Sequence, residues 1–104
     1  MLDFYLIKDA IAKPNGNTSS LNYAGSIDTK AFEYLQKIKT IEDWLDFDSD
    51  FRWTYTQVLK KYDKLSTIND SAKSSDPKKS QRATMLSILQ QAKDAESGLI
   101  AYGD

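Results

Sequence analysis

Three aspartates alternate with other residues in the stretch WLDFDSDFRWTY. Asp46, Asp48 and Asp50 have the spacing of the first, third and fifth ligands of a calcium-binding loop, in which alternating oxygens converge on one cation. The pattern then fails, because Phe51 stands where the turn needs glycine and Gln57 stands where a bidentate glutamate belongs. A magnesium ion held by two of these aspartates and a substrate phosphate is an alternative, although no glycine-rich phosphate loop accompanies them. We therefore predict no metal site and no cofactor.

The same segment concentrates negative charge. Five carboxylates fall within nine residues without one cation among them, namely Glu42, Asp43, Asp46, Asp48 and Asp50. Like charges this close repel one another unless a partner neutralises them. If the chain projects them together, they form an acidic surface that suits a basic protein, because complementary charge raises association rate and selectivity. The alternatives are a solvated acidic turn and helix capping.

Trp53 adds an aromatic candidate to this acidic segment. On the wheel of a helix over residues 51–65 it lies nearly opposite the apolar stripe that begins at Phe51. Either another element covers it, or it is partly exposed beside the aspartates as a binding anchor. Exposed tryptophans are enriched at interface hot spots, so we take Trp53 as the predicted anchor. Trp44 and Phe47 are assigned to the core.

A basic cluster marks the predicted start of the last helix. Lys78, Lys79 and Arg82 crowd its first turn, where the helix dipole disfavours positive charge. Cations and free backbone N–H groups at such a turn can face one phosphate, which makes these residues a weak candidate for anion binding. The alternative is a solvated basic turn.

The composition excludes further chemistry. The chain has 104 residues and neither Cys nor His, so it lacks thiolate nucleophiles, disulfides and the commonest general base. Its serines stand in no Gly-x-Ser-x-Gly motif. We therefore expect that the protein is not an enzyme. A formal net charge of -1, from 14 basic and 15 acidic residues, predicts no general attraction to nucleic acid or to an anionic membrane.

Length and hydropathy bear on location and domain count. No apolar run approaches about 18 residues, and charges interrupt the N-terminal apolar stretch, so we expect neither a membrane span nor a secretory signal. A cytoplasmic protein is the expectation. A chain of this length holds one hydrophobic core, so residues 1–104 are predicted to be a single domain.

Periodicity and turn signals predict the elements that must position these residues. Asp28 is a good N-cap for the first helix, because its carboxylate can accept hydrogen bonds from free backbone N–H groups. In chain order the predicted elements are strand 2–7, loop 13–26 with a short strand at 21–24, helix 29–39, helical turn 40–45, helix 51–65, exposed connection 66–81, helix 77–97 and strand 99–102.

The two terminal apolar runs, LDFYLI and LIAY, are each too short to be stable alone. Pairing them beside a helical layer would bury both. The predicted fold is therefore α+β and mainly helical, with about three main helices plus a short helical turn, and a small sheet formed by the N- and C-terminal strands.

Several pieces of the sequence suggest a class of protein. They are YAGSID, FEYL, the Trp/Asp-rich WLDFDSDFRW and the ending GLIAYGD, in a small, mildly acidic chain without Cys. In general character the chain resembles the immunity proteins that bacteria encode beside polymorphic or contact-delivered toxins. The resemblance implies inhibition by occlusion, in which tight complementary contact blocks the partner's active site or a nearby surface.

The leading hypothesis is a protein-binding domain, an immunity- or antitoxin-like inhibitor of a basic partner such as a nuclease toxin. Acidic steering and aromatic anchoring would come from Asp46, Asp48, Asp50 and Trp53, with Glu42 and Asp43 in support. The alternative is a homodimeric structural or regulatory subunit that associates through helical apolar residues or a strand edge. A magnesium-dependent or phosphate-handling enzyme is the weakest hypothesis.

Overall fold

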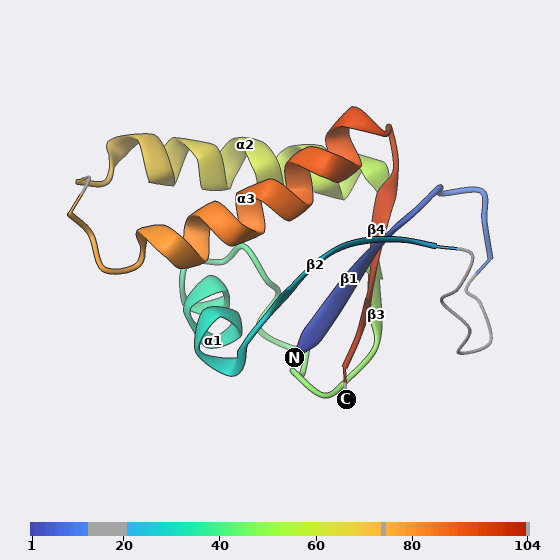
Figure 1. Cartoon of the computed structure of the whole chain (residues 1–104), viewed down its shortest axis with the longest axis horizontal. Coiled ribbons are helices and arrows are strands. Elements are labelled where there is room, and N and C mark those ends of the chain that lie inside the picture. The colour runs from blue at the N-terminus through green and yellow to red at the C-terminus, as the bar shows by residue number, and fades with distance from the viewer. Residues whose placement is uncertain (13–20, 74, 104) are drawn as a thin grey trace.

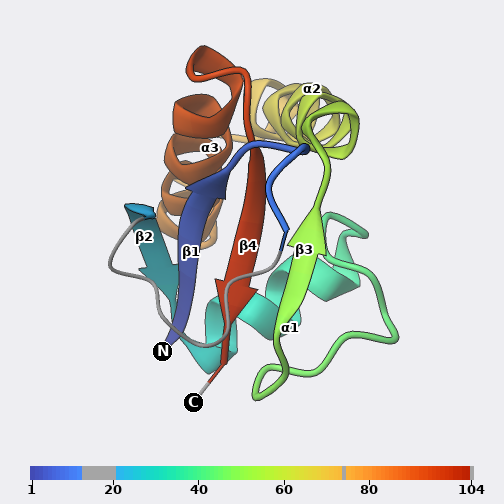
Figure 2. The ribbon, with the colours of Figure 1, turned by 90° about the vertical axis from the view of Figure 1, so that its right-hand side faces the viewer.

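The computed structural model describes residues 1–12, 21–73 and 75–103. In chain order the helices and strands of this part are β1 (Leu2–Ile7), β2 (Asn22–Ile27), α1 (Thr29–Lys37), β3 (Phe51–Trp53), α2 (Tyr55–Ser71), α3 (Lys79–Asp94) and β4 (Gly98–Tyr102). The strands form one antiparallel sheet in the order β2-β1-β4-β3, and the helices lie together on one of its faces (Figures 1 and 2). The predicted α+β class is confirmed, but the sheet is larger than the pair of terminal strands that we predicted.

The centre of the sheet is the predicted pairing of the two ends of the chain. β1 and β4 run antiparallel, with Asp3 opposite Tyr102 and Ile7 opposite Gly98. β2 pairs with the other edge of β1, and the register shifts beside Gly25, whose φ of 147° suits glycine. β2 overlaps the short strand that we predicted at 21–24 and continues to Ile27, beyond the predicted end of the loop at residue 26. Residues 13–20 lie outside the described residues.

The core fills the space between the sheet and the helices. Alternate residues of β1, β3 and β4 point into it, because successive side chains of a strand face opposite sides. The helices contribute Phe32 and Leu35 from α1, Val58 and Leu65 from α2, and Met85, Ile88 and Leu89 from α3, all of them buried. Burial of this apolar surface is the main stabilising contribution to the fold.

The first helix begins as the sequence predicts. The Asp28 carboxylate accepts a hydrogen bond from the Ala31 backbone N–H at 2.8 Å, which satisfies one of the free donors of the first turn. α1 ends at Lys37, and Lys39 then adopts a positive φ of 67°. The residues that follow, 40–45, form turns rather than the predicted short helix.

The prediction of one helix over residues 51–65 is wrong at its start. Phe51–Trp53 form β3, which pairs with Leu99–Ala101 of β4. Thr54 then caps α2, because its side chain accepts from the Gln57 N–H while the Gln57 side chain accepts from the Thr54 N–H. This reciprocal capping box fixes the start of the helix after the strand. α2 also continues to Ser71, into the stretch that we predicted as an exposed connection.

The last helix is shorter than predicted at both ends, since α3 begins at Lys79 and ends at Asp94. The Asp76 carboxylate accepts a hydrogen bond from the Lys78 N–H at 2.8 Å, but Lys78 is the N-cap residue and its side chain makes no capping hydrogen bond. Glu96, with a φ of 52°, reverses the chain into β4. Within the described ranges, no helix is long and apolar enough to cross a membrane.

Gly98 marks the closest backbone approach around the junction of β3, α2 and β4. A Cβ atom at this position would lie 2.3 Å from the Trp53 carbonyl oxygen, which belongs to the paired strand and cannot move aside freely. We expect Gly98→Ala to lower the free energy of unfolding by about 1–3 kcal/mol, measured by urea denaturation. Ser87→Ala, at an exposed position of α3, is the matched control. Equal midpoints for the two variants would contradict this packing argument.

Candidate protein-binding loop

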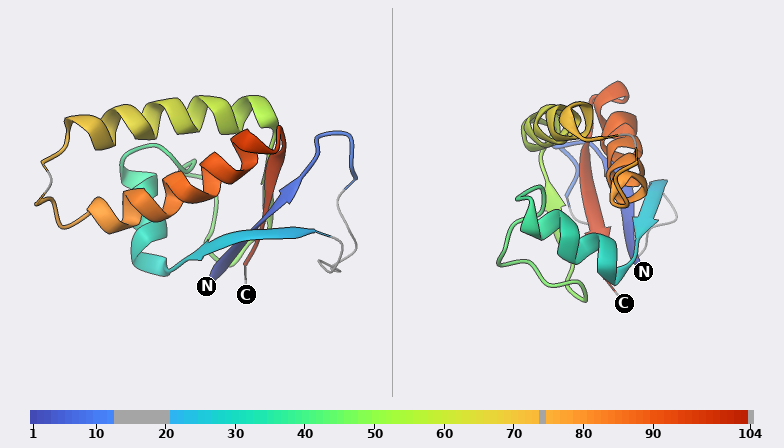
Figure 3. Two further views of the ribbon diagram at one scale, coloured as in Figure 1. Left: turned by 45° about the horizontal axis from the view of Figure 1, so that its top comes forward. Right: turned by 90° about the vertical axis from the view of Figure 1, so that its left-hand side faces the viewer.

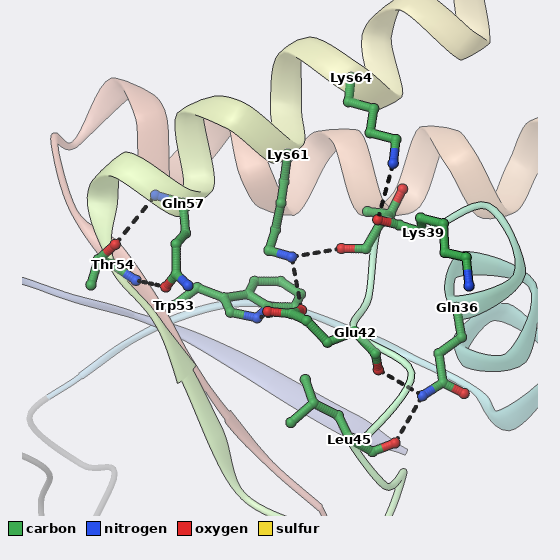
Figure 4. A network of polar contacts seen from close by, with 10 residues as sticks. Gln36, Lys39, Glu42, Leu45, Trp53, Thr54, Gln57, Lys61 and Lys64 are labelled. Atoms are coloured by element: carbon green, nitrogen blue, oxygen red, sulfur yellow. Dashed lines mark hydrogen bonds and ion pairs between the residues drawn. The ribbon is translucent and has the colours of Figure 1, made fainter.

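The predicted acidic residues lie in the connection between α1 and β3, which we call the acidic loop (residues 42–50). The Gln36 side-chain amide, on α1, donates hydrogen bonds to the backbone oxygens of Glu42 at 3.0 Å and Leu45 at 2.8 Å (Figure 4). Phe47 packs edge-on against Phe32, with ring centroids 5.6 Å apart. The backbone of the acidic loop is therefore attached to α1 at several points.

Trp53 is not the exposed anchor that the sequence analysis proposed. Its side chain is 1% exposed and packs against the rings of Phe4 and Phe51 in the core. The error follows from the secondary structure, because the helical wheel does not apply to a strand with a period of two. The indole Nε1 donates a hydrogen bond to Glu42 Oε1 at 3.2 Å.

Glu42 is used inside the protein as well. The same carboxylate oxygen forms an ion pair with Lys61 Nζ at 2.8 Å, and the side chains of Glu42 and Lys61 are only 20% and 14% exposed. Lys61 also donates to the Thr40 carbonyl oxygen and lies 4.4 Å from the ring centroid of Trp53 (Figure 4). This half-buried junction joins the acidic loop to β3 and α2, so Glu42 is a structural residue.

The other acidic residues differ in how far they are used internally. Asp43 forms an ion pair with Lys39 at 2.6 Å, and both side chains are exposed. Such a surface pair is worth about 0–1 kcal/mol, so Asp43 can exchange it for a partner. Asp50 accepts a hydrogen bond from the Gly103 N–H at 3.2 Å. Asp46 and Asp48 are exposed, and in the described part of the chain their carboxylates make no hydrogen bond or ion pair.

The exposed indole of the acidic loop belongs to Trp44, which the sequence analysis assigned to the core. Trp44 is 80% exposed, and exposure then alternates along the chain, with Leu45 and Phe47 partly buried and Asp46 and Asp48 exposed. The alternation of apolar and acidic residues in LDFD was a readable signal for this arrangement. Trp44 and the two unpaired aspartates are therefore all exposed, within one short stretch of the chain.

The calcium-loop spacing of this segment does not bring its three aspartates together. Among the described residues, no group of three or more acidic side chains is close enough to hold a metal ion. Asp46, Asp48 and Asp50 therefore do not converge on a common point, even though their spacing matches three calcium ligands.

The basic cluster does not present three free cations either. Arg82 is 2% exposed, and its guanidinium donates to Asn69 at 3.0 Å, to Tyr34 at 3.0 Å and to Asp76 at 3.1 Å. Lys78 Nζ lies 5.5 Å from the Tyr34 ring centroid. Arg82 is thus committed to the interior, and anion binding at this turn stays a prediction for the two lysines.

Two pKa shifts in this cluster follow from its hydrogen bonds. The backbone N–H of Lys78, together with the guanidinium of Arg82, lowers the pKa of Asp76 below its ordinary value. The hydrogen bond to Tyr34, together with the Asp76 carboxylate, raises the pKa of Arg82 despite its burial. Near the acidic loop, burial raises the pKa of Tyr102, and the negative charge of Asp50 adds to this effect.

Comparison with known proteins found no match, since no protein-family model, no curated protein and no solved structure matches the chain.

The two tryptophans should differ sharply in solvent access. In Trp44→Phe the remaining indole is the buried Trp53, so we expect blue-shifted fluorescence that acrylamide quenches poorly. The wild-type protein adds the emission of an exposed indole, which acrylamide quenches readily. Equal quenching of wild type and Trp44→Phe would contradict the assignment of Trp44 as the exposed residue.

The hydrogen bond from the Lys78 N–H and the ion pair with Arg82 should make the contribution of Asp76 to stability fall in acid. Because the folded pKa of Asp76 is lowered, its contribution is complete above the ordinary value of 3.8 and is lost as the pH falls through the folded pKa. We expect Asp76→Asn to be less stable than wild type at neutral pH, with the difference vanishing at the acid end of a series of urea denaturations. Asp63→Asn, exposed on α2, is the control and should match wild type at neutral pH.

Proposed function

We propose that the chain is a cytoplasmic protein-binding domain, an immunity- or antitoxin-like inhibitor that neutralises a basic partner such as a nuclease toxin. The observation that carries the proposal is the exposed indole of Trp44, close in sequence to the exposed carboxylates of Asp46 and Asp48. Trp44 takes the anchoring role that the sequence analysis gave to Trp53. Asp43 and Asp50, both exposed, add negative charge on either side.

Binding would proceed in two physical steps. The carboxylates of the acidic loop attract a positively charged surface and raise the rate of encounter, an effect that salt weakens. The indole then loses its contact with water against an apolar or cationic site of the partner, which slows dissociation. The net charge of -1 is too small for long-range steering, so the attraction comes from local charge.

The attachment of the acidic loop favours this use. The hydrogen bonds from Gln36, the Phe32–Phe47 contact and the Glu42–Lys61 pair hold its backbone on the body of the protein. A surface that is already ordered loses less conformational entropy when it binds than a mobile one. Nucleases bind a polyanion through cationic surfaces, so an acidic surface of this kind competes for the same groups.

The test is affinity for a purified protein with a basic surface, beginning with the product of the neighbouring reading frame. We expect Asp46→Lys/Asp48→Lys to lower the association rate about tenfold or more at low salt, because repulsion replaces steering. Trp44→Ala should cost at least about 2 kcal/mol of binding free energy, mainly through faster dissociation. Surface plasmon resonance on the purified pair separates the two rates, and coexpression reports protection from the toxin.

Asp63→Lys/Asp70→Lys is the matched control, since it changes the net charge equally at exposed positions of α2. It should bind and protect as wild type does. If a purified basic partner binds the acidic-loop reversal and the control with equal rates, the acidic loop is not the binding surface.

A further inference from the structure

A second charged surface lies on α1, in a groove of about 600 Å³ between this helix and the turn before α3. The groove, which we call the basic groove, is lined by Lys30, Glu33, Tyr34, Lys37, Ile38 and Lys78. Three ammonium groups therefore face one carboxylate. In the described chain, the ammonium groups of Lys30 and Lys37 make no hydrogen bond or ion pair. Their charge is available to an outside molecule.

Tyr34, the aromatic residue that lines the basic groove, is fixed by a hydrogen bond from the protein interior. The Tyr34 hydroxyl accepts a hydrogen bond from the buried Arg82, and Arg82 is itself fixed by Asp76 and Asn69. Lys78 lies beside the same ring. The position of the phenol ring is set before any ligand arrives, which reduces the entropy lost on binding.

The spacing of the cations indicates the kind of ligand. Lys30 and Lys37 are seven residues apart on α1, so they lie about 10 Å apart along its axis. Carboxylates spaced along a peptide segment can pair with both lysines at once. The groove offers the phenol of Tyr34 and the side chain of Ile38 between the lysines, which favours a segment that also carries a large apolar or aromatic side chain.

This chain presents such a segment itself, in the acidic loop with its exposed Trp44. Phe32 and Gln36, which hold the acidic loop, lie on one side of α1, whereas Tyr34 and Lys37 lie nearly opposite at roughly 100° per residue. Figure 3 shows the connection after α1 on one side of this helix and the start of α3 on the other. The two complementary surfaces face apart, so they can meet only between molecules.

We propose that the acidic loop of one molecule docks into the basic groove of a second copy of this chain. Trp44 packs against Tyr34 and Ile38, and the aspartates lie beside the three lysines. Because the two surfaces are on different sides of the molecule, the contact is head to tail and extends into short chains instead of closing a twofold dimer. Self-association and a basic partner then compete for the same acidic loop, which goes beyond the function proposed above and does not depend on it.

Sedimentation velocity of the purified protein over a concentration series tests the proposal. We expect the average mass to rise with concentration in about 0.01 M salt and to fall to that of a monomer in about 1 M salt, where charges are screened within about 3 Å. Lys30→Glu/Lys37→Glu and Asp46→Lys/Asp48→Lys should each associate at least about tenfold more weakly, because each places like charges in contact.

The decisive measurement mixes these two variants. The first has an acidic groove and the second a basic loop, so both contacts are complementary again only in the mixture, which should regain the mass of wild type. Three results would overturn the proposal: a wild-type monomer at every concentration in low salt, association that neither variant weakens, or a mixture that stays monomeric. A wild-type monomer in low salt would not contradict the proposed binding of a basic partner, because that binding needs only the acidic loop.

Discussion

The arrangement of the molecule around its candidate site depends on one carboxylate. Glu42 receives the Trp53 indole N–H and the Lys61 ammonium on the same oxygen, and so joins the acidic loop, β3 and α2. A half-buried charge is costly without a partner, and each of these three groups satisfies the others. Trp53 is held in the core, and Trp44 is the tryptophan that the acidic loop exposes.

The five acidic residues that look equivalent in the sequence therefore have different roles. Glu42 stabilises the interior, and Asp50 binds the backbone near the C-terminal strand. Asp46 and Asp48 are exposed, as is the indole of Trp44, and these are the side chains that we propose for recognition. Charge density along the chain shows where such a surface lies, whereas the contacts of each carboxylate decide which side chains belong to it.

Local signals predicted those parts of the fold that local interactions determine. The Asp28 cap, the α1 face and the pairing of the two apolar ends are in the structure because short-range chemistry specifies them. β3 was missed because Phe51 also fits the apolar stripe of the helix that follows, and only pairing with Leu99–Ala101, far along the chain, makes residues 51–53 a strand. The structural role of Glu42 was also missed because its partner Lys61 lies 19 residues away in the sequence. Trp44 was misplaced through a wrong choice of period.

The position of β4 in the sheet has a consequence for biosynthesis. This strand comes last of the four in the sequence, yet it lies between β1 and β3 and supplies the neighbour that each of them needs. While the ribosome is still making the chain, β3 has no partner and β1 is paired on one edge only. The sheet is complete only after residue 102 leaves the exit tunnel, so the nascent chain carries unpaired strand edges until that point.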